Sequence, residues 1–281
     1  MPLPTNPGPI GVFDSGYGGL TILSQIRKVL PQYDYIYLGD NARTPYGTRS
    51  FEVVYDFTRQ AVAKLFEMGC HLVILACNTA SAKALRSIQM NDLPGWDAQR
   101  RVLGVIRPTV ECIGSLTHSR HIGVLATSGT IRSDSYPLEI HKLYPDIRVT
   151  GQACPMWVPL VENNEASSPG ADYFVQKYID SLLTQDPQID TVILGCTHYP
   201  LLSEAISRCV PGAALISSGA EAAKMVAASL RNSALAAPQT HDGKRRYFVS
   251  DSVEQFRQNA GMYLCHPLDG DVEWVDIEKY E

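Results

Sequence analysis

The sequence predicts an α/β protein made of two pseudo-symmetric, doubly wound domains with mainly parallel sheets. Short apolar runs alternate along the chain with helical stretches, an order typical of parallel strands joined by helices. The length of 281 residues exceeds the usual size of one domain, so two domains, or one large one, are expected. An internal repeat, described below, favours two related halves.

Most of the predicted elements are apolar runs short enough to be buried parallel strands. The expected strands are Ile10–Phe13, Tyr35–Leu38, Leu72–Ala76, Val102–Ile106, Ile122–Ala126, Ile147–Ala153, Thr191–Leu194, Leu215–Ser217 and Arg246–Ser250. The expected helices are Phe51–Met68, Ala171–Leu183, Glu221–Leu230 and Val253–Leu264, the last with Ser252 as its N-cap. In Phe51–Met68 the apolar residues Val54, Phe57, Ala61 and Leu65 form a helical stripe.

The internal repeat consists of two short matches in the same order. VILAC at 73–77 matches VILGC at 192–196, and IGV at 10–12 matches IGV at 122–124. Nearly equal spacing of the two matches indicates two related α/β halves. Such letters are also common in unrelated strands, so coincidence is the alternative. The boundary is expected within 91–101, NDLPGWDAQRR, which has Pro, Gly and charge but no periodicity, and 231–244 is expected to be a loose connector.

Composition narrows the classes of function. The net charge of −5 and the pI near 5.8 argue against a nucleic-acid-binding surface. No apolar run approaches the length that spans a bilayer, and the N-terminus does not look like a signal peptide. Seven scattered cysteines, with no C-x-x-C pair, predict neither a disulfide framework nor a zinc ribbon and favour a reducing cytoplasm.

Two of these cysteines carry the chemical hypothesis. Cys77 and Cys196 each end a predicted strand and precede a predicted helix, the corner where open α/β sheets bind ligands. Either thiol alone is best interpreted as a buried, inert cysteine, but a matching pair is hard to attribute to packing. If the halves face each other, the thiols flank one cleft, so the active site is expected between the domains. One thiolate could then remove a proton while the other thiol delivers one to the opposite face, with no cofactor.

Other polar residues near these strand ends can be interpreted either as part of a functional site or as ordinary structural residues. Asp14 opens the turn DSGYGG, which could cradle a carboxylate or phosphate, or Asp14 could cap a helix. The loop DNARTPYG at 40–47 is a connector or a ligand loop. Glu162 is expected in a long loop that closes a cleft or exposes a solvated acid, and His198 could hold or relay a proton.

Four motifs together resemble the glutamate racemases, of the aspartate/glutamate racemase superfamily. They are IGVFDSGYGGL at 10–20, YLGDNARTPYG at 37–47, VILACNTASA at 73–82 and VILGCTHYPLL at 192–202. The resemblance covers nearly the whole chain and departs at no catalytic position. It implies interconversion of L- and D-glutamate without pyridoxal phosphate, which supplies D-glutamate for bacterial peptidoglycan.

The resemblance also implies roles for individual residues. Cys77 and Cys196 would be the proton donor and acceptor, with Asp14 beside the first and the pair Glu162 and His198 beside the second. The residues that would hold the α-amino and α-carboxylate groups are Ser15, Asn78, Thr79 and Thr197. The residues that would contact the side-chain carboxylate are Pro45, Tyr46 and Gly47.

The fold of the family implies a first domain at 1–98 completed by 212–281, and a second at 99–211. The expected partners are a small-molecule substrate, glutamate, and a second copy of the chain in a homodimer, with no metal, nucleic acid or membrane. The nearest rival is an aspartate racemase, although DSGYGG favours glutamate. A thiol redox protein and a non-catalytic binding module are the rivals from other classes.

Overall fold

The computed structural model describes residues 8–97, 99–231 and 243–278, and the chain divides into two compact units. The first unit comprises Met1–Val105 and Gly219–Glu281, and the second comprises Ile106–Ser218. The divisions thus follow residues 105 and 218, whereas the sequence placed its domain boundaries after residues 98 and 211. The stretch 91–101 is not a plain linker, since it contains the end of a π-helical turn, Ile88–Asp92, and the helix α5, Leu93–Trp96.

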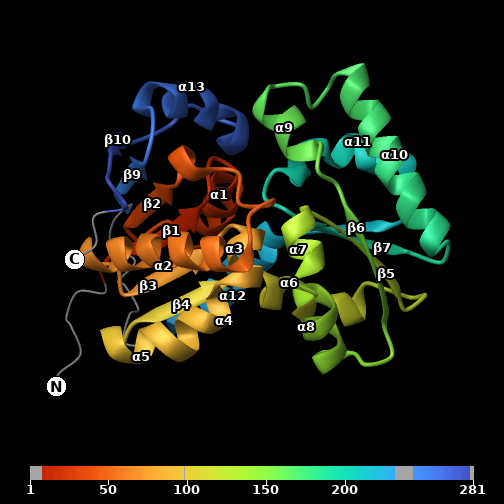
Figure 1. Cartoon of the computed structure of the whole chain (residues 1–281), viewed down its shortest axis with the longest axis horizontal. Helices are drawn as coiled ribbons and strands as arrows, with labels where there is room; N and C mark the ends of the chain where they lie inside the picture. The colour runs from red at the N-terminus through yellow and green to blue at the C-terminus, as the bar shows by residue number, and fades with distance from the viewer. Residues whose placement is uncertain (1–7, 98, 232–242, 279–281) are drawn as a thin grey trace. The chain divides into compact units, whose positions relative to one another are not determined.

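The first unit contains a six-stranded sheet in which every paired strand is parallel (Figure 1). Its strands, in the spatial order β10-β9-β2-β1-β3-β4, are Asp271–Trp274, Arg245–Val249, Tyr35–Gly39, Ile10–Asp14, Leu72–Leu75 and Arg101–Gly104. Its α-helices are α1 Gly19–Val29, α2 Phe51–Glu67, α3 Asn78–Lys83, α4 Leu85–Ser87, α5, α12 Ser218–Arg231 and α13 Val253–Leu264. The central strands β1, β2 and β3 are buried along their whole length, as expected for mostly apolar strands of a parallel sheet.

The second unit contains a parallel four-stranded sheet in the spatial order β6-β5-β7-β8. These strands are Arg148–Ala153, His121–Ala126, Thr191–Gly195 and Ala214–Ser217. Its α-helices are α6 Ile106–Glu111, α7 Ser128–Arg132, α8 Ser135–Leu143, α9 Trp157–Glu162, α10 Pro169–Gln185 and α11 Ser203–Cys209. Two parallel sheets with intervening helices confirm the predicted fold class.

The two sheets share one topology and one register. The order β2-β1-β3-β4 in the first sheet is repeated as β6-β5-β7-β8 in the second. Val12 pairs with Ile74 in the first sheet, and their repeat counterparts Val124 and Ile193 pair in the second. The sequence repeat is therefore a structural repeat, and coincidence no longer explains it.

This shared topology determines where each sheet can bind a ligand. In the first sheet, β2 lies on one side of β1, and the chain then crosses over β1 to form β3 on its other side. In the second sheet, β6 and β7 lie on the two sides of β5 in the same way. Because such crossovers are right-handed, steps in opposite directions place their helices on opposite faces of the sheet. Open parallel sheets bind ligands where such steps reverse direction, so the carboxyl ends of β1 and β3, and of β5 and β7, are the expected binding positions.

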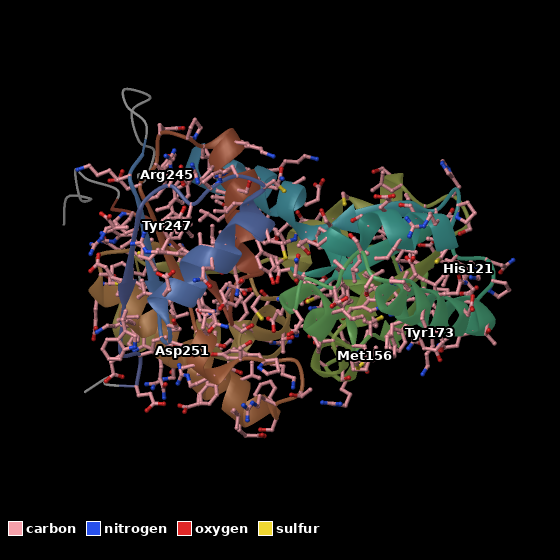
Figure 2. The ribbon with its side chains drawn as sticks, turned by 90° about the horizontal axis from the view of Figure 1, so that it is seen from above. His121, Met156, Tyr173, Arg245, Tyr247 and Asp251 are labelled. Carbon is pink, nitrogen blue, oxygen red and sulfur yellow. The ribbon has the colours of Figure 1, made fainter. Side chains whose placement is uncertain are left out.

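The C-terminal segment adds two strands to the first sheet. Strand β9 pairs with β2, so that Tyr37 lies opposite Tyr247, and β10 extends the same edge. Figure 2 labels Arg245 and Tyr247 on β9 and Asp251 just beyond its end. Helix α13 packs against α1, and Ser252 caps α13 by accepting a hydrogen bond from the amide of Gln255, as predicted.

Several elements differ from the sequence prediction. Short helices such as α7, α8 and α9 were not predicted because five to nine residues show too little periodicity. Strand β10 was missed because Val272 is its only buried residue. The predicted connector falls mainly at 232–242, outside the described residues. Among the helices that the structure describes, none is long and apolar enough to cross a membrane.

Candidate active site

The first thiol lies at the carboxyl end of β3, beside the end of β1. Cys77 is the N-cap of α3, and its sulfur accepts a hydrogen bond from the amide of Ala80 at 3.5 Å. The hydroxyl of Ser15, at the end of β1, lies 3.6 Å from the same sulfur. Asn78 and Thr79 form the first turn of α3 and are buried. A thiol at the start of a helix, beside a hydroxyl, has the polar surroundings that an inert core cysteine lacks.

Asp14 is the last residue of β1, the strand that pairs with β3. Its side chain is buried, and Oδ2 accepts a hydrogen bond from the amide of Gly16 at 3.0 Å. The N-cap of α1 is Gly18 rather than Asp14. The interpretation of Asp14 as the cap of this helix is therefore wrong, and the carboxylate instead closes the tight turn that carries Ser15.

The loop at 40–47 is anchored by a buried carboxylate. Asp40 accepts hydrogen bonds from the hydroxyls of Tyr46, at 2.5 Å, and Ser250, at 2.8 Å. Its Oδ2 atom also accepts a bond from Nε of Arg43 at 2.7 Å. The ring of Tyr46 is buried and its hydroxyl is used by Asp40, so any substrate contact of this residue would come from its backbone. Pro45 and Gly47 flank Tyr46 at the more exposed turn of the loop.

The second thiol lies at the carboxyl end of β7, the strand that pairs with β5. The sulfur of Cys196 is 3.7 Å from Nδ1 of His198, and Nε2 of His198 is 3.0 Å from Oε1 of Glu162. Thr197, the residue between Cys196 and His198, is also buried, and its hydroxyl lies 3.4 Å from Nδ1 of His198. Glu162 is the last residue of α9, so the prediction that it lies in a long loop is wrong. The helix fixes the direction from which Glu162 reaches the imidazole.

His198 is a buried base held between two acidic partners. Burial lowers its pKa, but hydrogen bonds to Cys196 and Glu162, together with their charges, outweigh burial and raise the pKa to about 10. A protonated imidazole donates from both nitrogens, so in this form His198 can bond to the sulfur and to the carboxylate at once. The group can therefore store a proton next to Cys196 near neutral pH.

The two corners match in their thiols but not in their helpers. In the shared register, Ala126 holds the position of Asp14 and Thr127 holds that of Ser15. The second corner thus lacks a carboxylate on its central strand, and the pair of His198 and Glu162 supplies one from elsewhere. Within the first unit, Cys77 lies close to Ser15, and within the second unit Cys196 lies close to His198. Both of these polar residues were assigned to the site from the sequence.

Sequence reasoning missed two hydroxyls at the second corner. Thr127 caps α7 by accepting a hydrogen bond from the amide of Thr130, and the two hydroxyl oxygens lie 3.2 Å apart. Both follow strand β5, which pairs with β7, the strand that ends just before Cys196. The strand register aligns Thr127 with Ser15, whereas the match of the letters DSG at 14–16 with TSG at 127–129 aligns Ser15 with Ser128.

Comparisons with known proteins agree with this geometry. The model of the Asp/Glu/Hydantoin racemase family matches residues 20–226. A glutamate racemase of Geobacter metallireducens is 40% identical over 96% of this chain and 97% of its own. The crystal structure of a glutamate racemase of Bacillus anthracis superposes with a TM-score of 0.88 at 36% identity, over 96% of this chain and 97% of that chain. A glutamate racemase of Francisella tularensis, solved with D-glutamate, gives a TM-score of 0.88 at 35% identity, over 97% and 99% of the two chains.

The fold defines a two-unit α/β protein with a buried thiol at the equivalent strand end of each sheet. The chain belongs to the Asp/Glu/Hydantoin racemase family. It is therefore an isomerase of the amino-acid racemase class, and the resemblance indicated by its sequence motifs is confirmed.

Proposed function

We propose that the protein interconverts L- and D-glutamate with two thiols and no cofactor. The observation that carries this proposal is the pair of cysteines at equivalent corners of two sheets, each beside polar groups of its own. Inversion of a stereocentre needs proton exchange on two opposite faces, and two separate thiols suit that need. The relatives described as glutamate racemases, one of them solved with D-glutamate, support glutamate as the substrate.

In the proposed reaction, one thiol takes a proton from the α-carbon and the other thiol returns a proton to it. From L-glutamate, the thiolate of Cys196 takes the α-proton, and the electron pair of the broken C–H bond stays on the α-carbon, delocalised into the carboxylate. The thiol of Cys77 then gives its proton to the opposite face. The enzyme is left with a thiol at Cys196 and a thiolate at Cys77, which is the form that accepts D-glutamate.

The surrounding residues would stabilise the charges of this step. Asp14 would assist proton transfer at Cys77, and His198, oriented by Glu162, would assist Cys196. The groups that would hold the α-amino and α-carboxylate ends are Ser15, Asn78, Thr79 and Thr197, joined by the hydroxyls of Thr127 and Thr130. Pro45, Tyr46 and Gly47 would bind the side-chain carboxylate, with Tyr46 using its backbone.

Circular dichroism of substrate solutions tests the proposal. Incubation with L-glutamate should bring the optical signal of the solution to zero, and incubation with L-aspartate should leave its signal unchanged. Racemisation of aspartate at an equal rate would favour the rival substrate. A structure with a TM-score of 0.53 to this chain, an aspartate racemase of Picrophilus torridus, is only 17% identical and supports the fold alone.

The wider role follows from the same resemblance. We expect the D-glutamate to serve peptidoglycan synthesis in a bacterial cytoplasm, and we expect the protein to be a homodimer. Light scattering during size-exclusion chromatography should give about twice the 30.9 kDa mass of the chain. Depletion of the protein in its host should create a requirement for D-glutamate, and normal growth without it would contradict the role.

A further inference from the structure

The carboxylate of Asp14 is packed directly against the start of α1. An ideal Cβ atom on Gly19 would lie 2.5 Å from Cβ of Asp14 and 3.1 Å from Cβ of Ala76. Both neighbouring atoms are attached to backbone at strand ends, so they cannot swing away as the tip of a flexible side chain could. Only glycine at position 19 lets the helix approach Asp14 this closely, and the approach restricts the side chain of Asp14.

The turn that follows Asp14 is held from the neighbouring strand as well. The hydroxyl of Tyr37, on β2, donates a hydrogen bond to the carbonyl of Gly16 at 2.8 Å, while the amide of Gly16 donates to Asp14. Tyr37 is completely buried, and its ring contacts the rings of Tyr247 and Phe256. Burial, with a contribution from the nearby charge of Asp14, raises the pKa of Tyr37 well above its usual value, so the phenol remains a donor.

A second aromatic contact connects this turn to the C-terminal segment. The ring of Tyr17 stacks on Phe256 at 5.5 Å and on Tyr263 at 5.9 Å, and both partners belong to α13. The turn is thus fixed at Asp14 by α1, at Gly16 by β2 and at Tyr17 by α13. A turn that merely joined a strand to a helix would not need three independent supports.

We infer that Gly19 and Tyr37 are positioning residues that set the carboxylate of Asp14 for proton transfer at Cys77. The inference rests on the proposed role of Asp14 in racemisation. Neither residue needs to touch the substrate. Gly19 acts by limiting where the side chain of Asp14 can lie, and Tyr37 acts through the backbone of Gly16.

Gly19→Ala is the first test. The added methyl group should displace Asp14 and lower kcat by about 10- to 100-fold, the usual penalty for misplacing a catalytic group by about 1 Å. Because the equilibrium constant between enantiomers is one, kcat/KM must fall equally in both directions. Gly95→Ala is the matched control, since an added Cβ there meets nothing within 4 Å, and it should leave kcat unchanged.

A double-mutant cycle separates positioning from a general structural effect. If Gly19 acts through Asp14, then Gly19→Ala should cost little further activity once Asp14→Asn is present. The fraction of folded protein, from circular dichroism and thermal unfolding, corrects each rate. Tyr37→Phe should behave in the same way with a smaller loss of about 2- to 10-fold, as expected for one hydrogen bond.

The outcomes distinguish the inference from the proposed function. Wild-type protein that fails to racemise glutamate would refute the proposed function itself. Active wild type with additive losses, or with an undiminished kcat in Gly19→Ala, would overturn the positioning role and leave the racemase proposal intact. If Gly19→Ala does not fold, the cycle between Tyr37→Phe and Asp14→Asn decides, with non-additive losses supporting the inference and additive losses overturning it.

Discussion

Nε2 of His198 lies 3.0 Å from Oε1 of Glu162, while the other ring nitrogen faces the sulfur of Cys196. Among the residues that the structure describes, no such carboxylate–imidazole pair lies beside Cys77, where the proposed helper is Asp14 on the central strand. Under the proposed mechanism, the two halves of the repeat would reach similar acid–base chemistry by different means.

Replacement of Glu162 should make activity more sensitive to alkaline pH. His198 is protonated below its pKa of about 10, and Glu162 is one of the groups that raise that value. In Glu162→Gln the pKa should fall, so the alkaline decline of kcat from L-glutamate should begin at a lower pH than in the wild type. Rates measured from pH 7 to 10.5, with NMR titration of His198, would show the shift.

The neighbouring acid provides the control for that measurement. Glu165 lies three residues beyond Glu162 and outside α9, so Glu165→Gln should keep the wild-type pH profile. An alkaline limb that is the same in Glu162→Gln and in the wild type would mean that the imidazolium of His198 does not limit the reaction.

Removal of either corner thiol should abolish racemisation without unfolding the protein. Cys77→Ala and Cys196→Ala would each remove one of the two proposed proton carriers, so we expect losses of at least about 10²- to 10⁴-fold. Cys154 is the matched control, because it is also buried and directly follows β6, another strand of the second sheet. Rates would be followed by circular dichroism of glutamate. Comparable damage from Cys154→Ala, in a folded protein, would show that burial rather than position makes these thiols important.

Activity should be independent of metals and of pyridoxal phosphate. The proposed step uses only thiols and their neighbours, so dialysis against a chelator should leave kcat unchanged and added pyridoxal phosphate should not increase it. Both measurements need the same protein preparation before and after treatment. Loss of activity on chelation, restored by one metal ion, would contradict the cofactor-free mechanism.

Asp40 should stabilise the fold as well as the loop that it anchors. Asp40→Ala would leave the guanidinium of Arg43, which is largely buried, without its carboxylate, and loss of one partner of a buried ion pair costs about 3 to 5 kcal/mol. The free energy of unfolding should fall by about that amount in urea titrations. Asp251→Ala, at an exposed position one residue after Ser250, should change it by less than about 0.5 kcal/mol. Similar values for the two variants would show that the Asp40 network contributes little.

The sequence predicted the sheets well because their central strands are buried on both faces. Short, mostly apolar runs such as 72–75 and 191–195 leave little ambiguity about where a buried strand lies. The repeat then placed the two thiols at equivalent strand ends of the two sheets. Edge strand β10 escaped prediction for the opposite reason, since its exposed residues carry no apolar pattern.

The residues that surround the two cysteines were harder to predict from the sequence than the cysteines themselves. Glu162 comes 36 residues before His198, and no local pattern relates them, so only the resemblance to a known family paired them. The hydroxyl of Tyr46 donates a hydrogen bond to Asp40. The sequence of the loop, rich in turn-forming residues, does not reveal this tertiary contact. The role of Gly19 is likewise invisible in sequence, because it depends on the distance between a helix start and a strand end.

The incorporation of solvent deuterium tests the two-thiol mechanism most directly. L-glutamate would be incubated with the protein in heavy water, and the reaction stopped at low conversion. If Cys196 removes the α-proton and Cys77, already exchanged with solvent, delivers its own, the D-glutamate formed should carry deuterium at the α-carbon. The remaining L-glutamate should stay protiated, and D-glutamate as the starting material should give the mirror pattern. Substantial early deuterium in the remaining L-glutamate, matched by the same behaviour from D-glutamate, would contradict a mechanism in which each thiol serves one face.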